Sequence, residues 1–255
     1  MPSRKPASFT KPKKLPSHKV HTRLAQAIGE RILSGVYLPG SLLPNEAEWG
    51  AMFGASRTAV REAIKTLNGK GLLVSRTKVG SRVEPRDRWN LLDRDVLAWH
   101  CAAMDRRAFL QSAQEVRKLL EPGIAELAAT KHSPGQLARL TAALEGMRQA
   151  KTAGEMVEPD VQFHLALLAA TNNELLAPFG IIIEQALANL FDYTSRHNPK
   201  PLSVIPLHAN VAAAVAASDG AKARHAVMIL LEDTDAIIAA GQQPGRPAKM
   251  ALKPA

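Results

Sequence analysis

The sequence contains a single cysteine, Cys101, among 255 residues. A lone cysteine excludes an internal disulfide framework and is typical of a protein in a reducing cytoplasm. We therefore expect a buried, inert thiol at this position. Long apolar runs are also lacking, because none approaches the ~20 residues that a transmembrane helix needs. The N-terminus has no apolar segment followed by a small-residue cleavage site, so we expect no signal peptide.

Acidic residues are too few to balance the basic ones, and the formal net charge is +10. Residues 1–23 contain no acidic residue, and their lysines and arginines alternate with prolines that prevent a helix. We expect residues 1–21 to be a disordered basic arm and residues 241–255 to be a flexible tail. A positive surplus of this size favours a polyanionic partner, nucleic acid before an anionic membrane.

The chain is long enough for two domains of ~100–200 residues each. Near its start, Thr22, Asn45 and Ser56 each precede an apolar-periodic segment, and these residue types are common helix N-caps. The second of the three segments ends at Gly54. Two short helices joined by a tight, glycine-containing turn predict a helix-turn-helix within residues 22–84.

The helix expected after Ser56 has two distinct faces. Its apolar stripe consists of Ala59, Val60, Ala63, Ile64 and Leu67. Arg57, Arg61 and Lys65 recur every four residues on another face, with Thr58 in the first turn. The planar fork of arginine matches the guanine acceptors O6 and N7, so this face is a candidate for reading the DNA major groove. The alternative is a solvated basic face on an ordinary surface helix.

A basic hairpin is predicted directly after this helix. Residues 72–75 and 81–83 are short β-prone runs around a glycine-containing turn. Arg76, Lys78 and Arg82 make the hairpin basic, as expected for a wing that reaches the adjacent DNA backbone or minor groove.

The order of these features resembles the winged helix-turn-helix domain of GntR-type bacterial regulators over roughly residues 22–84. The resemblance is carried by Pro39-Gly40, Leu43-Pro44, Glu46, Ser56-Arg57-Thr58, Val60-Arg61-Glu62-Ala63, Leu67, Gly71-Leu72 and Gly80. It implies that Arg57, Thr58 and Arg61 contact DNA, with the wing helping. Two departures stand out: Ala47 replaces an arginine of many relatives, and the wing tip at 78–80 contains less glycine.

Beyond a polar linker at 85–91, only helical periodicity is present. The expected segments are 92–103, 106–131, 134–151, 155–171, 174–197, 203–217 and 220–240. The expected breaks are at Ser133-Pro134, Glu158-Pro159, Pro199 to Pro201 and Ser218-Asp219-Gly220. They predict an all-α bundle of six or seven helices over 92–240, so the whole protein should be mainly α. Trp89 and Trp99 either anchor the two domains to each other or fill the second core.

A candidate metal site lies in this helical region. Asp160 and His164 are four residues apart on a face that continues through apolar residues, and His208 lies on another apolar stripe. Buried charged and polar groups of this kind are costly unless they are paired or bind a metal. Imidazole and carboxylate suit Zn²⁺, Ni²⁺, Mn²⁺ or Fe²⁺. The alternative is a set of hydrogen-bonded core residues.

Arg117 also lies on an inward apolar face, and a buried arginine needs an anionic partner. Glu121, one turn later, is one candidate, and the carboxylate of a small-molecule effector is the other. Polar residues of the 174–197 segment are weaker candidates for the wall of an effector pocket: Asn189, Tyr193 and Arg196.

The helical region resembles the FCD ligand-binding domain of the FadR subfamily of the same regulators. The resemblance is carried by Glu115-Val116-Arg117, Leu120-Glu121-Pro122, Asp160, Phe163-His164, Asn172-Asn173, Leu175-Leu176, His208 and Asp219. It implies a metal held by one aspartate and three histidines, but the last position falls on Leu230, and His225 sits five residues earlier. Either three ligands suffice, with water or effector oxygens completing the shell, or the metal is lost. Within the subfamily the chain resembles sugar-acid (galactonate-type) repressors.

These observations predict a homodimeric DNA-binding transcription regulator, and not an enzyme. A small carboxylate, such as a sugar acid, should control its affinity for a pseudopalindromic operator. The alternatives are a metal-dependent enzyme built on Asp160, His164 and His208, a non-specific DNA-compacting protein, or an effector of another class (fatty acyl, amino acid or aromatic acid).

Overall fold

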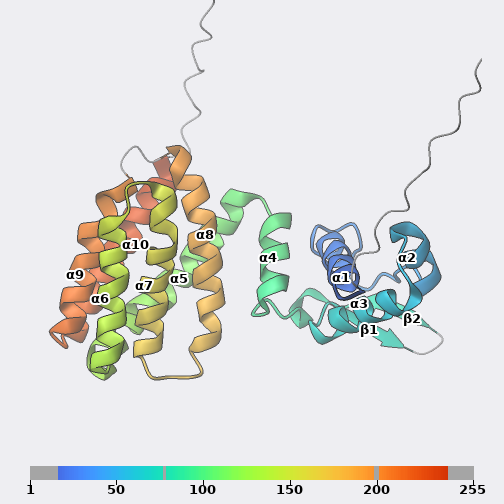
Figure 1. Ribbon diagram of the computed structural model, residues 1–255, viewed down its shortest axis with the longest axis horizontal. Helices are drawn as coiled ribbons and strands as arrows, with labels where there is room; N and C mark the ends of the chain where they lie inside the picture. Colours follow the sequence, from blue (N-terminus) through green and yellow to red (C-terminus); the bar gives the residue numbers. More distant parts are fainter. Residues whose placement is uncertain (1–16, 77–78, 198–200, 241–255) are drawn as a thin grey trace, which may run out of the picture. The chain divides into compact units, whose positions relative to one another are not determined.

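The computed structural model of the protein describes residues 17–76, 79–197 and 201–240, and the chain divides into two compact units, residues 1–103 and 104–255 (Figure 1). The first unit is a small helical domain with a hairpin, and the second is entirely helical in the residues described. The predicted mainly α fold class is therefore confirmed. The predicted arm at 1–16, the tail at 241–255 and Lys78 lie outside the described residues. No helix of the described chain has the length and apolarity needed to cross a membrane.

The first unit begins earlier than the sequence suggested. Its elements are α1 (Ser17–Leu33), α2 (Glu46–Phe53), α3 (Arg57–Gly69), β1 (Leu73–Arg76), β2 (Gly80–Val83), a 3-10 turn η1 (Arg86–Arg88) and α4 (Arg94–Ala103). The prediction that Thr22 caps the first helix is wrong, because α1 starts at Ser17 and contains Thr22. Pro16 is the last proline before this segment, so nothing in residues 17–21 prevents the helix from starting earlier.

The predicted caps of the next two helices are confirmed. The Asn45 side chain accepts hydrogen bonds from the amides of Ala47 and Glu48, and the Glu48 carboxylate in turn accepts one from the Asn45 backbone amide. Gly54 ends α2 in the left-handed conformation, with φ of 60°, which glycine adopts without strain. Ser56 then caps α3 by accepting from the Ala59 amide at 3.3 Å. These local bonds fix the turn between α2 and α3.

The wing is a two-stranded antiparallel hairpin, as predicted. Its register pairs Leu73 with Val83 and Arg76 with Gly80, and Leu42 adds an isolated bridge to Arg82. Leu73 and Val83 are buried, so one end of the hairpin is rooted in the core of the unit.

The helix expected to open the second domain belongs to the first unit instead. Trp89 and Trp99 are both buried in the core that also contains α1 and α3, so neither fills the core of the second unit. Trp99 packs so closely on Gly29 that a Cβ there would lie 2.4 Å from its ring. Lys70, just after α3, bonds Asp93 at 2.6 Å at the start of α4. Cys101 is also buried on α4, and burial raises the pKa of its thiol to about 12, as expected for an inert cysteine.

The second unit is a bundle built around its longest helix, α5. Its elements are α5 (Arg106–Lys131), α6 (Pro134–Gln149), α7 (Ala153–Ala170), η2 (Ala177–Phe179), α8 (Gly180–His197), η3 (Pro201–Val204), α9 (Ile205–Ala216) and α10 (Gly220–Ala240). Helices α7, α8, α9 and α10 all pack against α5, while α6 packs against α7 and α9. The four helices that surround α5 can therefore direct side chains toward a common interior.

One predicted helix break is absent. Pro159 lies inside α7, which is capped upstream by Thr152. An interior proline removes a backbone hydrogen bond and usually ends or kinks a helix. Here its ring packs against Gly146 of α6, where a Cβ would come within 3.2 Å of the proline. This close packing offsets part of the lost helix energy and keeps Asp160 and His164 on one continuous helix.

Candidate functional site

The first candidate site is the exposed face of α3. Arg57, Thr58, Arg61 and Lys65 are all exposed, as the spacing predicted. The opposite face holds α3 in place through buried Ala59, Val60, Ala63 and Leu67, with Ile64 partly buried. The helix therefore presents its N-terminal half, with two arginines, to solvent. This is the half of a recognition helix that contacts base edges in the major groove.

Arg61 is not isolated on this face. Its Nε donates to both carboxylate oxygens of Glu46, each at 2.9 Å, from the first turn of α2. Sequence reasoning identified both residues but not their pairing. The two are 15 residues apart on different helices, so no helical spacing could have shown it.

The wing contributes exposed basic residues beside α3. Arg76 is exposed, and Arg82 is exposed but donates through Nη1 to the Gly40 carbonyl. That bond commits part of the Arg82 guanidinium to the turn before α2. Lys78, the third basic residue predicted for the wing, lies outside the described residues.

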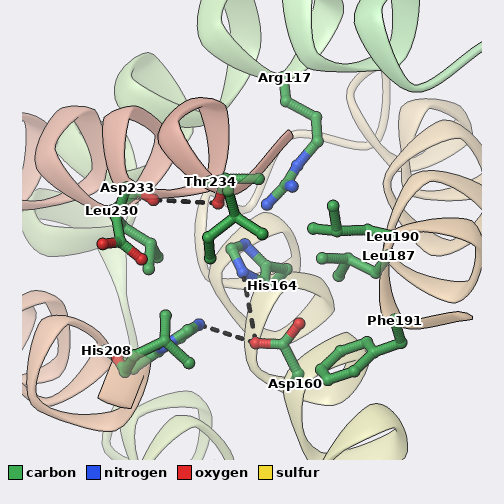
Figure 2. A pocket seen from close by; sticks show the side chains of 12 residues that line it. Arg117, Asp160, His164, Leu187, Leu190, Phe191, His208, Leu230, Asp233 and Thr234 are labelled. Carbon is green, nitrogen blue, oxygen red and sulfur yellow. Dashed lines mark hydrogen bonds and ion pairs between the residues drawn. The ribbon is translucent and has the colours of Figure 1, made fainter. Parts of the chain in front are cut away.

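The second candidate site is a cavity of about 50 Å³ inside the helical bundle (Figure 2). Its polar lining consists of Arg117 from α5, Asp160 and His164 from α7, His208 from α9, and Asp233 and Thr234 from α10. Its apolar lining consists of Leu187, Leu190, Phe191, Val204, Leu230 and Ile237. The structure thus brings together Arg117 and the three predicted metal ligands. The space is enough for a few water molecules and well below the ~300 Å³ of a typical ligand pocket.

Arg117 and Glu121 form a buried ion pair, which sequence reasoning had offered as one of two partners for the arginine. Arg117 Nε donates to Glu121 Oε1 at 2.6 Å, and both side chains are almost fully buried. The other oxygen, Oε2, lies 2.9 Å from His164 Nδ1. Burial by itself would raise the pKa of Glu121, but the charges of Arg117 and His164 outweigh it and lower the pKa to about 2. Glu121 is therefore ionised and accepts hydrogen bonds from both neighbours.

These contacts fix which nitrogen of each imidazole faces the cavity. Glu121 can only accept, so His164 Nδ1 carries the proton, and its Nε2 lies 3.9 Å from Asp160 Oδ1. His208 Nδ1 lies 3.1 Å from the Val204 carbonyl, which also can only accept. A neutral ring of either histidine therefore presents an unprotonated Nε2 toward Asp160.

The result is a cluster of electron-pair donors. His208 Nε2 lies 2.8 Å from Asp160 Oδ1, yet this buried nitrogen makes no hydrogen bond of acceptable direction. One donor atom from each of Asp160, His164 and His208 lies within 4.8 Å of the others. Burial raises the pKa of Asp160, but the neighbouring His208, His164 and Arg117 lower it by more, so the carboxylate is ionised. Such a set fits a divalent cation, and the Glu121 contact would orient His164 as a ligand.

Leu230 lies where the resemblance implied a fourth histidine, and it is buried in the lining of the cavity. His225 is exposed and lies elsewhere on α10, so it does not complete the cluster. Three candidate ligands therefore converge from the described residues, and the α10 side of the cluster is apolar at Leu230.

The predicted pocket wall on α8 is differently placed. Asn189 and Tyr193 are absent from the lining residues described: Asn189 bonds the Gln185 carbonyl at 2.8 Å, and the Tyr193 hydroxyl bonds the Ile238 carbonyl at 3.4 Å. Arg196 lies on α8, but its side chain is outside the described set. The inward face of α8 instead presents Leu187, Leu190 and Phe191, one helical step away. The polar character of Asn189 and Tyr193 did not show which side of α8 faces the cavity.

Comparison with known proteins identifies both units. Residues 21–83 match the model of the gntR family of bacterial regulatory proteins, and residues 113–233 match the FCD domain. The transcriptional regulator YieP of Escherichia coli (strain K12), described as uncharacterised, is 34% identical over 215 residues, which cover 83% of this chain and 92% of YieP. The chain belongs to the GntR family.

Two further relatives extend this assignment. The galactonate operon transcriptional repressor of Escherichia coli (strain K12) is 35% identical over 173 residues, covering 68% of this GntR-family chain and 76% of the repressor. A solved structure of Lar, which controls expression of the Listeria monocytogenes agr system, superposes with a TM-score of 0.56 at 16% identity, covering 90% of this chain and 99% of Lar. The second likeness concerns the fold alone.

Membership of the family confirms the function predicted from the sequence. This GntR-family protein is a DNA-binding transcription regulator with an N-terminal winged helix-turn-helix and a C-terminal FCD domain that makes DNA binding ligand-controlled. Its relatives are regulators, so it is not an enzyme, and the metal-dependent enzyme considered above is not supported.

Proposed function

We propose that this regulator is a homodimeric repressor of a sugar-acid operon, released from its operator by a small carboxylate bound beside Arg117. The observation that carries the effector class is the guanidinium of Arg117 in the wall of the bundle cavity (Figure 2). An arginine fork holds a carboxylate through two hydrogen bonds. The relative that represses the galactonate operon supports a sugar acid as the first candidate.

The small size of the cavity supports a link between binding and movement. A sugar acid needs more room than about 50 Å³, so the bundle has to widen to admit it. A ligand that binds the widened bundle better than the closed one shifts the protein toward the widened state. In a dimer, that change alters the spacing of the two recognition helices.

On the DNA side, Arg57, Thr58, Arg61 and Lys65 enter the major groove on α3. The wing residues Arg76, Lys78 and Arg82 then contact the neighbouring backbone. A two-fold dimer reads two half-sites, so the operator is a pseudopalindrome. The exposure of the α3 residues supports this role. We expect a protein with a DNA target to act in the bacterial cytoplasm.

Selection from a random duplex library tests the DNA part of this proposal. The full-length protein is expected to enrich one short pseudopalindrome with fixed spacing between its half-sites. Enrichment of no consensus, with uniform protection of long DNA in a footprint, would instead indicate a DNA-compacting protein and refute the operator.

We further propose that Asp160, His164 and His208 hold a divalent metal ion. The two Nε2 atoms that face Asp160 support this, because each can donate an electron pair to a cation when its ring is neutral. When bound, the metal would give the effector carboxylate a second positive partner opposite Arg117. Water or effector oxygen would complete its shell, since Leu230 offers no donor.

Replacing His208 with alanine should weaken metal binding by at least about tenfold, because even second-shell losses cost 10–100-fold. Metal content after loading with Zn²⁺, Ni²⁺ or Mn²⁺ and dialysis is the measurement, with about one ion per wild-type chain expected. His225→Ala is the matched control, since His225 is exposed on α10. Wild-type protein without bound metal, or a His208→Ala variant that keeps it, would contradict this site.

A further inference from the structure

The contact between Glu46 and Arg61 joins the two helices of the DNA-binding motif. Arg61 Nε donates to both Glu46 oxygens at 2.9 Å, although the two side chains remain 72% and 42% exposed. No other ion-pair partner of Arg61 occurs among the described residues. An exposed pair of this kind contributes little to folding stability, so its geometry is the more informative feature.

The atoms used in this contact leave the reading end of the arginine available. Arginine recognises guanine with two parallel N–H donors aimed at O6 and N7. Both bonds to Glu46 start from Nε, so the terminal Nη1 and Nη2 groups of Arg61 remain for a base edge. The Glu46 carboxylate therefore holds the guanidinium at Nε and does not engage Nη1 or Nη2.

Glu46 is itself held in place. It occupies the first turn of α2, directly after the Asn45 cap, and α2 is anchored by fully buried Trp49. Arg57 provides a contrast on the same face, because no side chain among the described residues pairs with it. Arg57 must lose side-chain freedom on binding, whereas Arg61 has lost part of it beforehand.

The negative charge of Glu46 also discourages a different use of Arg61. A guanidinium beside a carboxylate attracts phosphate less than a free one does, and the carboxylate itself repels phosphate. We propose that Glu46 is a positioning residue that aims Arg61 at a guanine base and keeps it from serving as a general phosphate contact. This inference rests on the proposed role of α3 as the recognition helix.

The test compares base preferences selected from a random duplex library by the full-length wild type, Arg61→Ala, Glu46→Gln and Glu46→Ala. Arg61→Ala first identifies the guanine that Arg61 reads, as the position where preference disappears. Both Glu46 variants are expected to lose about two- to fivefold of the guanine preference at that position, the scale of an exposed ion pair. Preferences at the other positions should persist.

Binding to a duplex that lacks the selected sequence gives an independent readout. Both Glu46 variants should bind it as tightly as the wild type or more tightly, with a log–log salt slope steeper by about 0.9, because the released Arg61 can neutralise one more phosphate. Glu62→Gln is the matched control, since it removes one exposed charge from α3 without touching Arg61. It should leave the base preferences unchanged.

Full guanine preference in Glu46→Ala would overturn the inference, as would an equal loss at every position, which indicates a structural role alone. Thermal melting shows whether either variant is unfolded. If Glu46→Ala is unfolded, the isosteric Glu46→Gln variant is used for the test instead. Failure of the wild type to select a consensus, or of Arg61→Ala to change one, would remove the recognition helix itself and the inference with it. Failure of the recognition-helix assignment can be told apart from failure of the Glu46 inference, because it is seen with the wild type and Arg61→Ala alone.

Discussion

Replacing Glu121 with alanine is expected to destabilise the second unit by about 3–5 kcal/mol. The change leaves the Arg117 guanidinium buried without its carboxylate and removes the partner of His164 Nδ1, and breaking a buried pair from one side has costs of this size. Urea unfolding followed by helical circular dichroism measures the difference.

The control for this prediction lies on the same helix. Glu126 on α5 pairs with Arg224 at 3.1 Å, but both side chains are about half exposed. Glu126→Ala should therefore cost no more than about 1 kcal/mol. Equal losses for the two variants would show that the Glu121 pair is not the buried element described here.

Removing both charges should be milder than removing one. In the double variant Arg117→Met/Glu121→Gln, the amide oxygen of the new side chain can still accept from His164 Nδ1, and neither member of the Arg117–Glu121 pair remains as a charge without the other. Neutral replacements of a buried pair are often close to neutral in stability. This variant therefore offers a folded protein that lacks the arginine proposed to bind the effector.

Arg57→Ala and Arg61→Ala should each weaken binding to the selected operator by about 1–3 kcal/mol, which corresponds to about 5–150-fold. Each change removes a guanine-reading fork, so the loss should appear on the selected duplex and much less on unrelated DNA. Lys65→Ala should weaken both duplexes similarly and reduce the salt slope by about 1, as for a phosphate contact.

Fluorescence anisotropy with labelled duplexes measures these affinities, and Arg224→Ala in the second unit is the control for loss of one positive charge. Wild-type operator affinity in both Arg57→Ala and Arg61→Ala would contradict the assignment of α3 as the recognition helix.

Local features of this fold followed from the sequence. Asn45 and Ser56 cap their helices because their side chains bond amides within three residues, a relation that short-range pattern reading captures. The apolar spacing of α3, α5, α7 and α9 likewise indicated which residues turn inward. As a result, Arg117, Asp160, His164 and His208 could be placed in one interior before their contacts were known.

Features that depend on contacts between distant segments did not follow. The placement of α4 with the first unit depends on Trp99 packing on Gly29 and on Lys70 bonding Asp93. Helical periodicity marks α4 as a helix but carries no information about which core receives it. Pro159 is tolerated inside α7 because it packs against Gly146, another distant contact.

The sequence also did not show how each helix is rotated about its axis or angled against its neighbours. On α8, polar character suggested Asn189 and Tyr193 as pocket residues, whereas the cavity is lined by Leu187, Leu190 and Phe191. The pairing of Glu46 with Arg61 likewise required the angle between α2 and α3. Such angles are set by packing of the whole unit and not by neighbours in sequence.

In the proposed mechanism, a small carboxylate in the bundle cavity controls how tightly α3 holds the operator. The most direct test measures the Kd of the full-length protein for its selected duplex during titration with galactonate, gluconate, glucuronate, an amino acid, an aromatic acid and a fatty acyl compound. We expect a sugar acid to raise the Kd at least about fivefold in the wild type, as typical allosteric coupling would, and to leave Arg117→Met/Glu121→Gln unaffected. A Kd that no compound changes, or an equal response in the double variant, would contradict the account.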